Sequence, residues 1–121
     1  MRLLCADDEE DIRTILQLAL SLDPDLEVEL VESGEAALAR ARTGRFDAIV
    51  LDGMMPGLDG YETCRRLKAD PATASLPVIF LTAKTQRGEV EQALNLGAVA
   101  CLMKPFDPMT LAAQLRAALG R

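Results

Sequence analysis

Carboxylates, a hydroxyl and an amine stand at the ends of four short apolar runs of this sequence. They are Asp7 and Asp8 after residues 3–6, Asp52 after residues 48–51, Thr82 after residues 78–81, and Lys104 after residues 98–103. Carboxylates are ligands that Mg²⁺ prefers, and a carboxylate can also accept a phosphoryl group as an acyl phosphate. If these residues meet in space, the pattern indicates a magnesium site built to receive a phosphoryl group.

The apolar runs must be elements that bring their ends together. Short unbroken apolar runs are typical of strands that are buried on both faces of a parallel sheet. Ligands of open α/β sheets bind at the carboxyl ends of the strands, so the polar residues would gather at one edge. A single strand-end Asp could equally be a helix N-cap or a turn residue. Four coincident strand ends argue against that simpler interpretation.

Strands and helices are expected to alternate along the whole chain. The expected strands cover residues 1–6, 26–32, 46–51, 77–81 and 98–103, with 26–32 at a sheet edge. After each strand, apolar residues recur at helical spacing and predict a helix. The first expected helix ends at about Leu22, and the others cover Ser33 to near Gly44, about 59–69, Val90 to Gly97 with Ala93 and Leu94, and 111–119. This alternation predicts one domain over residues 1–121, a three-layer α/β/α sandwich with five parallel strands. The flavodoxin-like order 2-1-3-4-5 would place the first and third strands side by side.

Composition and charge narrow the possible functions. Half of the 121 residues are apolar and the net charge is −6, which argues against nucleic-acid or membrane-surface binding by this domain. No apolar run approaches membrane-spanning length and no signal peptide is evident, so we expect a cytoplasmic protein. The absence of histidine removes Ser-His-Asp catalysis and His-ligated zinc. Cys5, Cys64 and Cys101 have no paired or C-x-x-C spacing, and Cys5 and Cys101, which lie within apolar runs, are expected to pack.

Four motifs in this order resemble the receiver domain of two-component response regulators, a family with a CheY-like fold. They are D-D-E at 7–9, L-D-G-M-M-P-G-L-D-G at 51–60, L-T-A at 81–83 and K-P-F at 104–106, and together they extend over the whole chain. Within the second motif, Gly57 and Gly60 are expected to be turn residues that need permissive backbone angles. The resemblance implies a phosphoacceptor domain in a phosphorelay, which takes its phosphoryl group from the phosphohistidine of a sensor histidine kinase or phosphotransfer protein.

The resemblance also implies a role for individual residues. Asp52 would be the phosphoacceptor, and Thr82 and Lys104 would bind the phosphoryl group, with Lys104 pairing to Asp52 when that group is absent. The implied Mg²⁺ ligands are Asp8 directly, Asp7 mainly through water, Asp52, and the backbone carbonyl of Met54. Met54 and Lys84 occupy positions that tune the phosphoryl lifetime. Such a domain is a signalling protein rather than an enzyme, although it assists its own Mg²⁺-dependent phosphorylation and dephosphorylation.

One position departs from the family pattern. Receiver domains usually carry Tyr or Phe three residues before the lysine, and Cys101 stands there in this chain. A thiol cannot fill or vacate a space the size of a ring, so the usual aromatic switch is in question. Our hypothesis is that an apolar, partly open face formed by the fourth helix, fifth strand and fifth helix switches binding of a downstream target or fused output domain. The loop from Thr82 to Arg87 would carry the change.

The sequence argues against other functions that a similar fold can perform. A Cys-x5-Arg phosphatase is excluded because Asp stands six residues after each cysteine, and a haloacid-dehalogenase-type phosphohydrolase would need an Asp where Met54 stands. Flavin binding needs a Ser/Thr/Gly-rich loop after the first strand, and that loop is acidic here. The remaining alternative is a pseudo-receiver, an interaction module that is not phosphorylated and dephosphorylated. The intact set of acidic, hydroxyl and amine residues argues against this alternative.

Overall fold

A computed structural model describes residues 1–83 and 87–121 and has a five-stranded sheet at its centre. The strand order is β2-β1-β3-β4-β5, and every neighbouring pair is parallel. The strands are β1 (Arg2–Ala6), β2 (Glu27–Val31), β3 (Ala48–Leu51), β4 (Val78–Ala83) and β5 (Ala100–Lys104). The predicted flavodoxin-like order is confirmed, so β1 and β3 lie side by side at the centre of the sheet.

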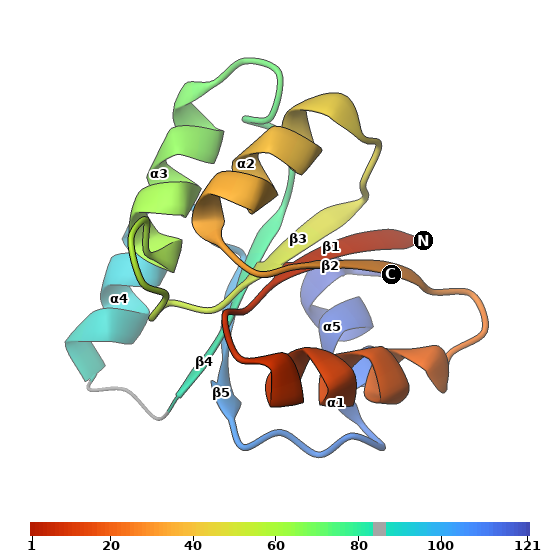
Figure 1. Cartoon of the computed structure of the whole chain (residues 1–121). Helices are drawn as coiled ribbons and strands as arrows, with labels where there is room; N and C mark the ends of the chain where they lie inside the picture. Colours follow the sequence, from red (N-terminus) through yellow and green to blue (C-terminus); the bar gives the residue numbers. More distant parts are fainter. Residues whose placement is uncertain (84–86) are drawn as a thin grey trace.

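Helices cover both faces of this sheet (Figure 1). They are α1 (Glu10–Ser21), α2 (Gly34–Thr43), α3 (Gly60–Ala69), α4 (Arg87–Asn95) and α5 (Leu111–Leu119). Figure 1 shows α1 and α5 on one face, and α2, α3 and α4 on the other. The three-layer α/β/α sandwich is therefore confirmed. None of the described helices is both long enough and apolar enough to cross a membrane.

Two apolar cores separate the sheet from its two helical layers. Successive strand side chains point to opposite faces, so Leu4 packs on the side of α2 and α3 while its neighbours Leu3 and Cys5 pack on the side of α1 and α5. All three side chains are fully buried. The unbroken apolar runs of the sequence are explained by this burial on both faces.

Two polar caps set the starts of the helices that flank β3. The Ser33 hydroxyl accepts a hydrogen bond from the N–H of Ala36 at 3.1 Å, and the Asp59 carboxylate accepts one from the N–H of Glu62 at 2.8 Å. Each cap satisfies a donor of the first helical turn that otherwise has no partner. The predicted start of α2 at Ser33 and its end near Gly44 are both confirmed.

Some element boundaries differ from the expected ones. β3 begins at Ala48 rather than at residue 46, because its pairing with β1 begins at Ala48, opposite Leu3. Phe46 lies before the strand, with its ring centroid 4.9 Å from the guanidinium of Arg2. α4 ends at Asn95, and Gly97 lies beyond it with a φ of 99°. Leu94 is 47% exposed, so it stands at the margin of the apolar face of α4 rather than inside it.

Candidate metal and phosphoryl site

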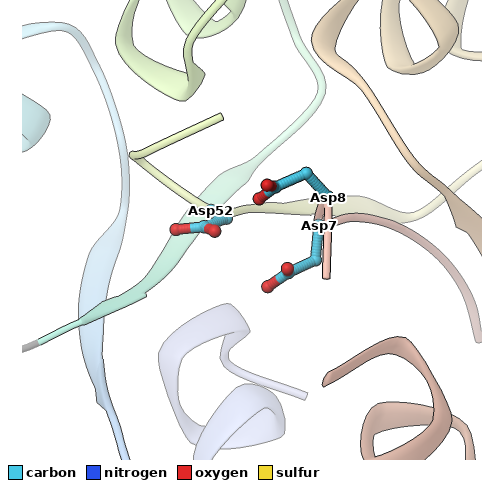
Figure 2. A group of neighbouring side chains, drawn as sticks. All are labelled: Asp7, Asp8 and Asp52. Carbon is cyan, nitrogen blue, oxygen red and sulfur yellow. The ribbon is translucent and has the colours of Figure 1, made fainter. Parts of the chain in front are cut away.

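Three carboxylates meet at the carboxyl ends of β1 and β3. One ligand oxygen from each of Asp7, Asp8 and Asp52 lies within 4.8 Å of the other two. Figure 2 shows the three side chains projecting into the same region. Asp7 and Asp8 follow β1 and Asp52 follows β3, so the adjacency of these two strands brings together residues from distant parts of the chain. The predicted meeting of strand ends is thus observed.

Asp52 is held in a largely buried position. Its backbone N–H donates to the carbonyl of Ala6 at 3.0 Å, and one carboxylate oxygen accepts from the N–H of Met54 at 3.2 Å. The residue is 4% exposed, and this burial raises the pKa of its carboxyl above the ordinary value. Met54 itself is exposed.

Lys104 connects the two buried carboxylates. Its ammonium lies 2.6 Å from Asp7 Oδ2 and 3.4 Å from Asp52 Oδ2, so in this structure it pairs more closely with Asp7 than with the expected Asp52. The other oxygen of Asp7 accepts the N–H of Glu9 at 2.9 Å, which aims Oδ2 at the lysine. Burial alone lowers the pKa of Lys104, but the hydrogen bond to Asp7 and the charge of Asp52 outweigh it and leave the pKa raised.

Thr82 supplies a buried hydroxyl with an unused donor. The residue is fully buried at the end of β4, and its Oγ1 has no hydrogen-bond partner among residues 1–83 and 87–121. Burying a hydroxyl without a partner costs free energy, so such a group calls for an explanation, of which an absent ligand is one. A phosphoryl oxygen bound beside Asp52 would accept the hydrogen bond that Thr82 can give.

The charge of the cluster fits a divalent cation. Among residues 1–83 and 87–121, three carboxylates of the cluster face the one ammonium of Lys104, which leaves two negative charges unbalanced within that part of the chain. The donor set consists of carboxylate oxygens, the ligand type that Mg²⁺ selects over softer nitrogen and sulfur donors. Asp8 is more exposed than Asp7 and Asp52, which are 1% and 4% exposed, so an ion would keep bound water on the Asp8 side.

Comparison with known proteins assigns this chain to a family. The response regulator receiver domain matches residues 3–116. The chain belongs to this receiver-domain family. It is 42% identical over 115 residues to the response regulator PleD of Caulobacter vibrioides, an alignment that covers 95% of this chain and 25% of PleD. It is 39% identical over 121 residues to the phosphate regulon transcriptional regulatory protein PhoB of Pseudomonas aeruginosa, covering 98% of this chain and 52% of PhoB.

Solved receiver-domain structures share the fold over nearly the whole chain. A putative response regulator from Chloroflexus aurantiacus superposes with a TM-score of 0.90 at 34% identity, covering 99% of this chain and 98% of that one. The chemotaxis protein CheY4 of Vibrio cholerae gives a TM-score of 0.88 at 32% identity, covering 97% of both chains. Acceptance of a phosphoryl group in two-component signalling is the function of this family. The chain spans between a quarter and about half of the length of PleD and PhoB.

Three residues near the site were not identified by the sequence analysis in these roles. Arg13 of α1 donates from Nη1 to the backbone carbonyl of Asp7 at 2.8 Å. Gly60 has no positive φ, so the expected need for a permissive angle is wrong there, although it is right for Gly57 at 74°. A methyl group added at Gly60 would lie 2.1 Å from the carbonyl oxygen of Asp52, so close packing requires this glycine. Tyr61 stacks on Phe80 with ring centroids 5.1 Å apart.

Residues 84–86 lie outside the described residues, so the structure says nothing of Lys84, the position expected to tune the phosphoryl lifetime, or of the middle of the loop from Thr82 to Arg87 that was expected to carry the change. Cys101 is half-buried in β5, where it pairs with Phe80 in the register with β4. Burial raises the pKa of Cys5 to about 12 and also raises that of Cys64, so these two thiols are poor nucleophiles. This agrees with the packing role expected for Cys5.

The raised pKa of Asp52 predicts a stabilising substitution. A raised pKa means that the folded chain binds this proton more tightly than the unfolded chain, so the free energy of unfolding falls as the pH rises above the ordinary value of 3.8. We therefore expect Asp52→Asn to raise the urea midpoint at pH 7.5 without Mg²⁺, and to raise it less at pH 4. The control is Asp11→Asn, which removes an exposed carboxylate of α1. A lower midpoint for Asp52→Asn at pH 7.5 would contradict the assigned burial penalty.

Proposed function

We propose that Asp52 accepts a phosphoryl group from a phosphohistidine in a Mg²⁺-dependent reaction. The observation that supports this most directly is the meeting of three carboxylates within 4.8 Å at one sheet edge, beside Lys104 and the unpartnered hydroxyl of Thr82. Each of these groups has a use around a phosphoryl group on Asp52. An aspartate that only capped a turn would need neither the other carboxylates nor the buried hydroxyl.

The proposed transfer is a displacement at phosphorus. A carboxylate oxygen of Asp52 forms the new O–P bond while the P–N bond of the phosphohistidine breaks, and the electron pair leaves with the imidazole nitrogen. A Mg²⁺ ion at the acidic cluster would offset the charge on the phosphoryl oxygens. Asp8 would hold the ion directly, Asp7 mainly through water, and Asp52 and the Met54 carbonyl would complete the protein ligands.

Lys104 and Thr82 would bind the transferred group. The ammonium of Lys104 already lies 3.4 Å from Asp52 Oδ2, so a small movement away from Asp7 would bring it to a phosphoryl oxygen. Binding of an ion by Asp7 favours that movement, since the carboxylate would then share its charge with the cation. The Thr82 hydroxyl would donate to a second phosphoryl oxygen. The same groups would assist hydrolysis of the acyl phosphate, with Met54 and Lys84 setting its lifetime.

The proposed partners follow from the family and from one exposed face. A sensor histidine kinase or phosphotransfer protein would supply the phosphoryl group in the cytoplasm, and a downstream target or fused output domain would respond. Leu94, Val99 and Met103 are 47%, 49% and 50% exposed on α4, the following turn and β5. This apolar surface supports the proposed output face of α4, β5 and α5. Any DNA binding would belong to another part of a longer protein, because this domain is acidic.

Direct phosphorylation tests the proposal. The chain is incubated with Mg²⁺ and an acyl phosphate such as acetyl phosphate, and its intact mass is measured by mass spectrometry. We expect a gain of one phosphoryl group that is lost in Asp52→Asn and when Mg²⁺ is chelated, but kept in Asp11→Asn. Absence of any gain with acyl phosphate or with a histidine kinase would overturn the proposal in favour of a pseudo-receiver that only binds partners.

A further inference from the structure

Two hydroxyl groups border one small space beside the phosphoacceptor. A methyl group added at Gly53 would lie 3.0 Å from the hydroxyl oxygen of Tyr61 and 3.1 Å from Oγ1 of Thr82. Gly53 directly follows Asp52, so this space, which is too narrow for a methyl group unless a hydroxyl moves, adjoins the site at which the phosphoryl group would be held. Since Thr82 Oγ1 has no hydrogen-bond partner among the described residues, its hydroxyl can turn without breaking a hydrogen bond made in that part of the chain.

The ring of Tyr61 extends from this space to the protein surface. It stacks on the buried ring of Phe80, with an interplanar angle of 20°. It also lines a groove of about 210 Å³ between α3 and α4, together with Asp59, Glu62, Arg65, Gln92 and Leu96. One side chain therefore contacts both the interior beside Thr82 and a surface groove. Phe80 pairs in register with Cys101, so the aromatic pair lies beside the position where the family's usual ring is missing.

We propose that Tyr61 is a positioning residue that couples the side chain of Thr82 to the groove between α3 and α4. The inference rests on the proposed function, because phosphorylation of Asp52 is what moves Thr82. When the Thr82 hydroxyl turns to donate to a phosphoryl oxygen, it withdraws from the space beside Gly53. The Tyr61 hydroxyl then enters that space, and its ring shifts along Phe80 and changes the wall of the groove. Tyr61 thereby performs a switch that a thiol at Cys101 cannot.

Intrinsic fluorescence gives a direct test, because Tyr61 is the one tyrosine of the chain and tryptophan is absent. The whole chain is treated with Mg²⁺ and acetyl phosphate while the mass gain and the tyrosine emission are followed together. We expect the emission to change by roughly a tenth or more as the hydroxyl exchanges its hydrogen-bonding surroundings. The change should be absent in Asp52→Asn and should fall to less than half in the phosphorylated fraction of Thr82→Ala.

Gly53→Ala is a second variant that acts on the shared space itself. Gly53 has no positive φ, so alanine is tolerated by the backbone, and its methyl group would press on both hydroxyls. We expect its emission to differ from that of the unmodified chain before any phosphorylation, and the further change on phosphorylation to fall to less than half. The variant must still gain one phosphoryl group, which its mass reports.

The outcomes separate this inference from the proposed function. A mass gain without any change in tyrosine emission would overturn the role of Tyr61 and leave phosphorylation of Asp52 standing. A change that persists at full size in phosphorylated Thr82→Ala or Gly53→Ala would do the same, since Tyr61 would then respond to the charge on Asp52 rather than to Thr82. Absence of a mass gain in the unmodified chain would overturn both.

Discussion

Lys104→Met is expected to lower the free energy of unfolding by about 3 kcal/mol at pH 7.5 without Mg²⁺, because removal of one partner from a buried ion pair leaves uncompensated charge. The side chains of Lys104, Asp7 and Asp52 are 13%, 2% and 5% exposed, so solvent screens this cluster little. Methionine keeps most of the volume of the lysine stem. The decrease in the free energy of unfolding would therefore come from the missing ammonium beside two ionised carboxylates, and not from a cavity.

Urea unfolding with and without Mg²⁺ measures this effect. Added Mg²⁺ should restore most of the lost stability, since the cation replaces the ammonium as the counter-charge. Acid should restore part of it as well, because burial raises the pKa of the Asp52 carboxyl, which becomes neutral as the pH falls. Equal stability of Lys104→Met and the unmodified chain without Mg²⁺ would show that the carboxylates do not depend on Lys104.

Lys68→Met is the matched control for this substitution. The ammonium of Lys68 donates to the backbone carbonyls of Ala74 and Leu76 at 3.2 and 3.0 Å, far along the chain from the acidic cluster. Loss of these hydrogen bonds, in which the donor is charged, should cost about 1.5 kcal/mol each. That loss should respond neither to Mg²⁺ nor to acid in the way expected for Lys104→Met.

Gly60→Ala is expected to destabilise the domain by about 3 kcal/mol or more, at the upper end of overpacking substitutions. The new methyl group would lie 2.1 Å from the carbonyl oxygen of Asp52 and 2.9 Å from the Cα of Gly53. These are backbone atoms of the phosphoacceptor loop, so relief of the clash must displace Asp52. Alanine is otherwise favoured over glycine in helices by about 1 kcal/mol, and a net loss would therefore isolate the steric effect.

Thermal unfolding and Mg²⁺ binding should both report the change at Gly60. We expect Mg²⁺ to raise the unfolding temperature of the unmodified chain and to raise that of Gly60→Ala much less. Gly57→Ala is the control from the same loop. Its methyl group would meet Glu35 at 3.6 Å, and its φ of 74° should cost about 1–2 kcal/mol while Mg²⁺ binding is retained. Unaltered stability and Mg²⁺ response in Gly60→Ala would refute the close-packing role.

Much of the fold and of the site could be predicted from local patterns in the sequence. Strands buried on both faces require unbroken apolar runs, and the residues that end those runs must lie at one sheet edge if the strands are parallel. That reasoning found Asp7, Asp8, Asp52, Thr82 and Lys104 without knowledge of any distance. The cap at Ser33 was equally accessible, because it depends on one hydroxyl and the first turn of its own helix.

Only the tertiary structure decided which partners the residues at the site contact. Lys104 could bond either of two carboxylates, and it lies closer to that of Asp7, 97 residues away in the sequence. Gly60 is required by the backbone of Asp52, and Tyr61 reaches the space beside Thr82 because α3 packs its ring on Phe80. Such choices depend on differences of an ångström or less between elements that are remote in sequence. Apolar periodicity fixes which face of an element is buried, but it carries no information at that scale.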